Sequence, residues 1–168
     1  MGEKQADAVD AIEAQWRRER PDLNLEAMAI IGRLGRLYLI AGQQIESVHG
    51  VHGLQRGEFD VLAALRRSGE PYELNPSVLA DTLMASRAGM TGRLDRLEKA
   101  GLVRRVADAG DRRAVKVVLT DRGLQVIDVA VTEHVENETR ILAPLSAGER
   151  QELDRMVRVL LAGLGTLD

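Results

Sequence analysis

Apolar residues recur at helical spacing at the start of the chain. Val9, Ile12 and Trp16 are spaced three to four residues apart among charged residues, within the stretch 4–20. Pro21 ends this pattern. The spacing predicts a short amphipathic helix.

A longer helical pattern follows, from Leu25 to about Ser47, and Asn24 can cap it. The glycine-rich run 49–53 is expected to end this helix. A third helix is then predicted over about 55–67.

The middle of the chain contains two shorter helical patterns joined by a tight turn. The first begins near Asn75 and runs to about Met84, the turn falls at Ala85 and Ser86, and the second helix runs to Ala100. Two short helices joined in this way form a helix-turn-helix.

The next stretch, 103–119, alternates apolar and polar residues and is interrupted by turn residues, so it predicts a hairpin with a charged tip. Thr120 can cap a long helix to about Leu142. Ser146 and Glu149 form a capping box for a last helix that ends near residue 164.

Composition supports a helical fold. Hydrophobic residues make up 45% of the 168 residues but aromatic residues only 2%, which favours helix packing over a β-sandwich. The expected fold class is mainly α (α+β), a winged helix-turn-helix with long helical dimerisation arms.

The order of elements predicts three regions. Residues 1–23 form an extra N-terminal helix, residues 24–54 and 121–168 form a helical dimerisation region, and residues 55–120 form the winged helix-turn-helix. The outer helices are amphipathic and far apart in the sequence, so a homodimer is expected to bury them.

Charge is distributed unevenly along the chain. Residues 86–116 contain nine basic and four acidic side chains, a local net charge of +5, whereas the whole chain carries −3 and the remainder therefore −8. A basic segment in an acidic protein is compatible with one DNA-binding face, although a solvated charged helix gives a similar count.

A helix-turn-helix inserts the N-terminal end of its second helix into the major groove. Here that end carries Ser86, Arg87, Met90 and Thr91, which we expect to contact double-stranded DNA. Met90 also begins an apolar stripe with the leucines at 94 and 97, which is expected to face inward.

The hairpin tip carries Arg112 and Arg113 directly after Asp111. Arginine is attracted to the strong negative potential of a narrow minor groove, so these two residues are candidate minor-groove contacts. An ordinary charged turn is the alternative.

The chain resembles the MarR family over about residues 25–165. The resemblance rests on residues 93–103, on the Asp-Arg-Arg run 111–113, and on Leu-Thr-Asp-Arg-Gly at 119–123. It implies a dimer that binds pseudo-palindromic DNA, commonly as a repressor that a small ligand releases, and it implies no enzymatic activity.

The added N-terminal helix gives a narrower resemblance to the urate-responsive branch of this family. That branch uses a tryptophan, an aspartate and two arginines, and the matching positions here are Trp16, Asp60, Arg93 and Arg105. The resemblance therefore implies a small aromatic anion such as urate as ligand.

The chemistry of these four residues suits a planar anion. Trp16 would pack on its face, and Arg93 and Arg105 would pair with its charge and oxygens, while Asp60 could hold one arginine before the ligand arrives. Alternatively, Trp16 is a core residue and Asp60 pairs with Arg56 on the surface. A phenolic acid is an alternative ligand, and a winged-helix interaction module without ligand sensing is an alternative function.

Other chemistry has little support in the sequence. The chain has no cysteine, which excludes disulfides and thiol redox sensing, and no catalytic arrangement stands out. His49, His52 and His134 could join a metal site, but a helix-ending loop explains the first two, and no cofactor is expected. Without an apolar segment that suggests a signal peptide or a membrane span, a cytoplasmic protein is expected.

Overall fold

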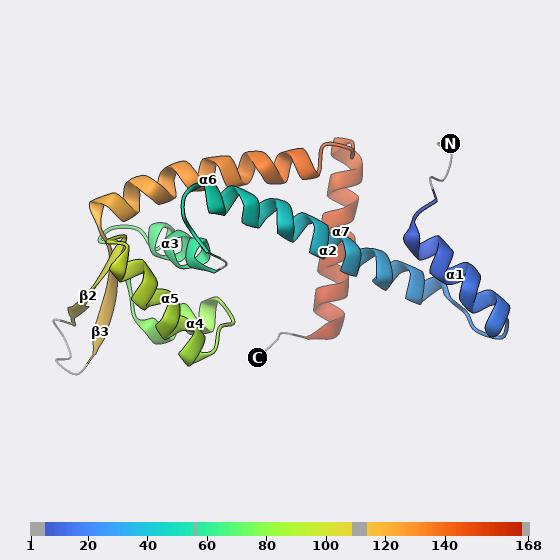
Figure 1. Ribbon diagram of the computed structural model, residues 1–168, viewed down its shortest axis with the longest axis horizontal. Coiled ribbons are helices and arrows are strands. Elements are labelled where there is room, and N and C mark those ends of the chain that lie inside the picture. Colours follow the sequence, from blue (N-terminus) through green and yellow to red (C-terminus); the bar gives the residue numbers. More distant parts are fainter. Residues whose placement is uncertain (1–5, 56, 109–113, 166–168) are drawn as a thin grey trace. The chain divides into compact units, whose positions relative to one another are not determined.

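The structure, a computed structural model, describes residues 6–55, 57–108 and 114–165. The chain divides into two compact units, Met1–Gln44 and Ile45–Asp168, and the boundary falls inside helix α2 (Figure 1).

The first unit contains α1 (Ala8–Glu19) and most of α2 (Glu26–Val51). Asp7 caps α1, because its Oδ1 accepts hydrogen bonds from the backbone N–H groups of Val9 and Asp10, at 2.7 and 3.1 Å. The Asp10 carboxylate accepts the N–H of Asp7 in return, at 2.8 Å. This capping box starts the helix several residues after the predicted start at residue 4.

Helix α2 ends at Val51, inside the run 49–53 that is expected to end it, so it continues through His49 and Gly50, a few residues past the expected end near Ser47. His49 is only 6% exposed, and its ring stacks on Phe59 with the ring centroids 4.0 Å apart. This packing favours helical backbone at His49. The chain leaves the helix at Gly53, whose φ of +69° suits glycine.

The second unit holds the remaining elements: α3 (Glu58–Arg67), β1 (Glu73–Leu74), α4 (Pro76–Thr82), α5 (Arg87–Lys99), β2 (Val103–Ala107), β3 (Val115–Leu119), α6 (Asp121–Ile141) and α7 (Ala147–Leu164). The strands form an antiparallel sheet in the order β1-β3-β2. Figure 1 shows α4 and α5 side by side, with the β2–β3 hairpin beyond the end of α5. The expected fold class, mainly helical with a winged helix-turn-helix, is confirmed.

Strand β1 is a finding that the sequence pattern did not predict. It has only two residues, and it exists because Glu73 and Leu74 pair with Val118 and Val117 of β3. A strand this short has no periodicity of its own, so only its neighbour in space defines it.

One apolar core joins α3, α4, α5, the sheet and α6. Its fully buried side chains include Leu62 and Leu65 of α3, Leu79 of α4, Val117 of β3 and Ile127 of α6. Burying aliphatic side chains of this size stabilises a fold by about 1.5–3 kcal/mol each, so this core fixes the relative positions of α3, α4, α5 and α6.

The two C-terminal helices begin as the sequence predicts. The hydroxyl of Thr120 accepts the N–H of Gly123 at 2.9 Å, and Ser146 and Glu149 form the expected capping box. Helix α7 buries none of its side chains. Within the described ranges, no helix is both long and apolar enough to cross a membrane.

Candidate DNA interface and ligand site

The N-terminal end of α5 is exposed and held by its cap. Ser86 precedes the helix, and its Oγ accepts the N–H of Gly89 at 3.1 Å. Ser86, Arg87 and Thr91 are all exposed. The Thr91 hydroxyl donates to the backbone carbonyl of Arg87 at 3.0 Å. A short polar and basic surface therefore surrounds the helix start, where backbone N–H groups favour anions.

Met90 does not belong to this surface. It is 2% exposed and packs in the core with Leu94 and Leu97, which are 2% and 1% exposed. The prediction that Met90 contacts DNA is therefore wrong for its side chain, because the same stripe that anchors α5 takes Met90 inward. The prediction of an inward-facing stripe is confirmed.

Polar contacts also connect α5 to the start of α3. The Arg96 Nε donates to Glu58 Oε1 at 2.7 Å, and the Glu58 carboxylate also accepts the N–H of Gln55 at 2.7 Å. Next to this pair, the guanidinium of Arg93 lies against Gly57, and a Cβ at position 57 would stand 2.4 Å from its Cζ. Arg93 therefore occupies space that only glycine leaves open.

Arg105 lies in β2, and it connects the hairpin of β2 and β3, which we call the wing, to α5. Its Nη2 donates to Asp95 Oδ1 and its Nη1 to Glu98 Oε2, both at 2.6 Å, and its backbone N–H donates to Glu98 Oε1 at 2.9 Å. Burial disfavours the charge of Arg105, but the two carboxylates outweigh that effect and raise its pKa.

A lysine of β3 forms ion pairs with carboxylates beside both neighbouring strands of the sheet. Lys116 of β3 reaches Glu73 of β1 at 2.5 Å and Asp108 after β2 at 3.7 Å. The hydrogen bond to Glu73 raises the pKa of Lys116, so the lysine stays charged at neutral pH. The tip of the wing, with the predicted contacts Arg112 and Arg113, lies outside the described residues.

The structure distributes the four predicted ligand residues over the two units. Trp16 lies in the first unit and is 41% exposed, so it is not a core residue of that unit. Asp60, Arg93 and Arg105 lie in the second unit, where Asp60 is exposed.

The described residues show no ion pair from Asp60 to Arg93 or Arg105. Arg105 pairs with Asp95 and Glu98 instead, and the expectation that Asp60 holds one of the two arginines stays a prediction. The alternative pairing of Asp60 with Arg56 involves a residue outside the described ranges.

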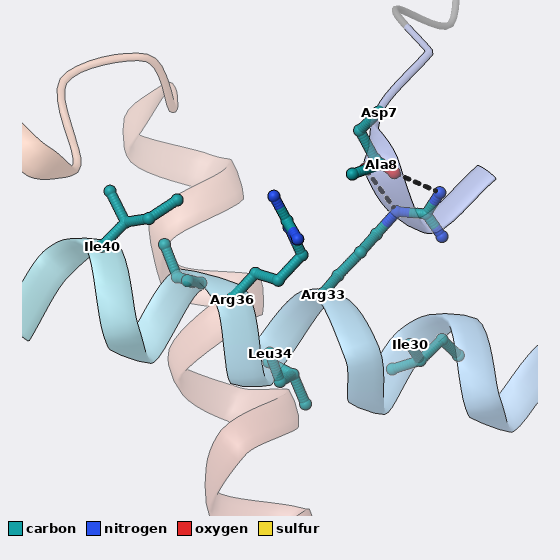
Figure 2. Close-up of a pocket in the computed structure, with 8 residues that line it drawn as sticks. Asp7, Ala8, Ile30, Arg33, Leu34, Arg36 and Ile40 are labelled. Carbon is teal, nitrogen blue, oxygen red and sulfur yellow. Dashed lines mark hydrogen bonds and ion pairs between the residues drawn. The ribbon is translucent and has the colours of Figure 1, made fainter. Parts of the chain in front are cut away.

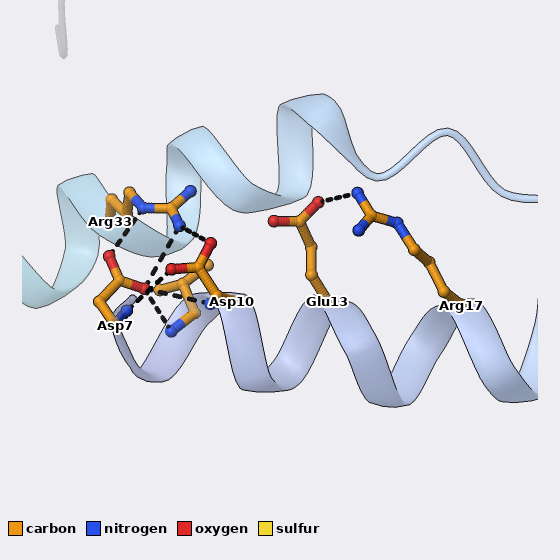
Figure 3. A network of polar contacts seen from close by, with 6 residues as sticks. Asp7, Asp10, Glu13, Arg17 and Arg33 are labelled. Atoms are coloured by element: carbon orange, nitrogen blue, oxygen red, sulfur yellow. Dashed lines mark hydrogen bonds and ion pairs between the residues drawn. The ribbon is translucent and has the colours of Figure 1, made fainter. Parts of the chain in front are cut away.

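The first unit also contains a polar network that the sequence did not predict. Arg33 of α2 donates to both Asp7, at 2.8 Å, and Asp10, at 2.7 Å (Figure 3). The hydrogen bond from Arg33 is the largest cause that lowers the pKa of Asp7, to about 2. Farther along α1, Arg17 pairs with Glu13 at 2.7 Å. The contacts from Arg33 hold α1 against α2.

Beside this network, Figure 2 shows a pocket of about 550 Å³ along α2. Arg33 and Arg36 extend from its wall, and apolar residues that include Ile30, Leu34 and Ile40 line the rest. None of the four predicted ligand residues lines it. A second pocket, of about 430 Å³, lies between α3 and α6 and is lined by Phe59, Arg66 and His134 among others.

The histidines form side-chain contacts around the end of α2. His49 Nε2 lies 3.2 Å from His134 Nδ1, and His52 Nε2 lies 2.8 Å from Glu133 Oε2. Burial is the largest cause that lowers the pKa of His49, and the neighbouring His134 adds to it. Among the residues described, no group of three or more such side chains could hold a metal ion.

The helix-turn-helix followed by a hairpin defines the second unit as a winged-helix protein. Residues 52–114 match the MarR family. The HTH-type transcriptional regulator PecS of Dickeya dadantii strain 3937 is 47% identical over 145 residues, which cover 86% of this chain and 87% of PecS. The chain therefore belongs to the MarR family of winged-helix transcriptional regulators.

Solved structures agree with this assignment. AbsC, a MarR family regulator from Streptomyces coelicolor, superposes with a TM-score of 0.73 and 26% identity, over 84% of this chain and 95% of AbsC. Sco3205 from the same organism, solved in complex with DNA, has a TM-score of 0.76 at 22% identity, over 86% of this chain and 91% of Sco3205. At 22% identity, the Sco3205 structure supports the fold assignment alone.

Proposed function

We propose that this protein is a homodimeric repressor that binds double-stranded DNA through α5 and the wing and is released by a small aromatic anion such as urate. The observation that carries DNA binding is the exposed end of α5, where Ser86, Arg87 and Thr91 surround a capped helix N-terminus. The core residues behind it hold the helix rigidly. Sco3205 was solved with DNA and a mutant MarR of Escherichia coli with operator DNA, which supports the same use of this fold here.

Exposed apolar side chains on the outer helices support the proposed homodimer. Helix α7 buries no side chain, and Leu160 and Leu161 are 48% and 61% exposed. On α2, Ile31 and Leu39 are each 64% exposed. Apolar faces of this kind are typical of subunit interfaces, and a second copy of the chain would bury them.

The DNA-binding proposal is tested with DNA from the region upstream of the protein's own gene. Arg87→Ala is expected to weaken binding and to lower the slope of log affinity against log salt by about one, because one phosphate-neutralising charge is lost. Arg140→Ala, an exposed arginine near the end of α6, is the matched control and should leave the slope unchanged. An unchanged slope for Arg87→Ala would remove that residue from the interface.

The ligand proposal rests on Trp16 and Arg93. Trp16 offers an exposed aromatic face, and the Arg93 guanidinium lies beside the start of α3. An anion that pairs with Arg93 would shift α5, whose N-terminal end is the proposed DNA-binding surface. This displacement supports ligand-induced release from DNA. Asp60 and Arg105 complete the predicted site.

Urate and xanthine titrations into the protein–DNA complex test this proposal. Urate is expected to reduce DNA binding of the native protein, and Trp16→Ala should keep DNA binding but lose the response. A native protein whose DNA affinity is unchanged at millimolar urate would contradict the urate proposal. Arg18→Ala, an exposed change on the same helix, is the control.

The pocket between α3 and α6 favours a phenolic acid as the second candidate ligand. Phe59 and Val131 offer an apolar wall, and Arg66 and Arg67 lie at its edge, a combination that suits an aromatic carboxylate. Salicylate is therefore the comparison ligand. A response to salicylate that Ala63→Phe abolishes and Trp16→Ala leaves intact would assign the response to this pocket.

A further inference from the structure

One side chain makes most of the polar connection between the wing and α5. Arg105 stands in the middle of β2 and reaches back to two carboxylates of α5, at 2.6 Å each. Its backbone N–H adds a third hydrogen bond, to Glu98. In the described part of the chain, no other ion pair or side-chain hydrogen bond joins β2 to α5.

The geometry of this contact restricts orientation as well as distance. Asp95 and Glu98 are three residues apart, so they share one face of α5. A planar guanidinium that binds both carboxylates through different nitrogens fixes its own plane against that face. The backbone bond then fixes the strand itself, so β2 has a defined angle to α5 at residue 105.

We propose that Arg105 is a positioning residue for DNA binding, which holds the wing at a fixed angle to α5 so that both meet the DNA together. This inference rests on the proposed DNA binding. It gives Arg105 a role besides the proposed ligand contact, because two carboxylates already pair with its guanidinium and the side chain is only 30% exposed.

Two variants break the contact from opposite sides. Arg105→Gln removes one positive charge, whereas the double variant Asp95→Asn with Glu98→Gln removes two negative charges. If Arg105 acted only through charge, the first variant would weaken DNA binding and the second would strengthen it. If Arg105 positions the wing, both variants lose the wing's contacts with DNA.

Hydroxyl-radical footprinting separates the wing from the helix, because it reports minor-groove protection base by base. We expect both variants to lose the minor-groove protections that flank the site and to keep the major-groove protections from α5, which dimethyl sulfate reports at guanine N7. DNA affinity should fall roughly tenfold or more, which corresponds to about 1.4 kcal/mol. Arg105→Lys, which keeps the charge but cannot bind both carboxylates with a planar fork, should also lose the flanking protections.

Each result has a definite meaning. Flanking protections that persist in Arg105→Gln or in the double variant would overturn the positioning role, and a loss of the urate response alone would assign Arg105 to the ligand site. If Arg105→Gln does not melt cooperatively, the double variant carries the test. A native protein that gives no footprint at all would instead contradict the proposed function.

Discussion

Glu58 and Arg96 form an ion pair, 2.7 Å from oxygen to nitrogen, that joins the first residue of α3 to the last turn of α5. The Glu58 side chain is only 6% exposed and also accepts the backbone N–H of Gln55. A buried carboxylate is tolerated because it has these partners. The pair therefore sets the position of α5 against α3.

Glu58→Gln is expected to destabilise the protein. The amide removes the charge and offers Arg96 a weaker acceptor at a buried position, which costs about 1–3 kcal/mol. Urea denaturation of the native and variant proteins measures the free energy of unfolding. Glu136→Gln, an exposed change on α6, is the control. Equal stability of the two variants would show that the Glu58 pair contributes nothing.

Gly57→Ala is expected to cost more than Gly69→Ala. Both glycines have positive φ, +77° and +79°, so both substitutions carry the same backbone strain of about 1 kcal/mol. Only at Gly57 does the new Cβ meet another group, 2.4 Å from the Cζ of Arg93, whereas nothing lies within 4 Å at Gly69. The difference between the two melting temperatures measures the cost of displacing Arg93. No difference would mean that Arg93 moves freely.

The stability of the protein should fall in mild acid through His49. Its pKa is lowered from 6.5, first by burial and then by His134, with a smaller contribution in the same direction from His52, while Asp60 and Glu46 act in the opposite direction. Because the unfolded chain then binds the proton more readily, the contribution is complete above the unfolded pKa and is lost as the pH falls below it.

Urea denaturation at about pH 8 and about pH 5.5, on either side of an ordinary histidine pKa, measures this effect. His49→Phe keeps an aromatic ring against Phe59 and removes the titrating group, so its stability should change less between the two conditions. An identical change in His49→Phe would place the acid sensitivity elsewhere. His52→Gln serves as the comparison for loss of a histidine near the same helix end.

Leu160→Asp is expected to weaken the proposed dimer. Leu160 stands on the apolar face of α7, at 48% exposure in the single chain, and a carboxylate there would be buried without a partner in the interface. We expect the dimer dissociation constant to rise at least about tenfold, which corresponds to about 1.4 kcal/mol. Sedimentation velocity over a range of concentrations measures it. Gln151→Asp places the same charge on the polar side of α7, and an equal effect there would contradict this face as the interface.

Local sequence signals predicted much of the fold because they act over a few residues. The cap at Thr120 and the box of Ser146 and Glu149 each satisfy backbone groups within one helical turn, so the sequence alone reveals them. The apolar stripe that begins at Met90 also needs only helical spacing. These features predicted the positions of α5, α6 and α7 along the chain.

The features that the sequence did not predict depend on partners far away along the chain. Strand β1 needs β3, and the helical backbone at His49 depends on Phe59 and on His134 in α6. The partners of Arg105 were also missed, although Asp95 and Glu98 share a helix face three residues apart, a spacing that signals a two-carboxylate acceptor.

Helix α1 buries a single side chain, Val9, and otherwise depends on exposed polar contacts, chiefly from Arg33 to Asp7 and Asp10. Exposed ion pairs contribute little free energy, so α1 should open far more often than the winged-helix core. Its backbone amides should therefore exchange with deuterium early, while those of α3 exchange last. A ligand that packs on Trp16 would slow the exchange of α1, and so a helix held mainly by surface contacts would report that the ligand has bound.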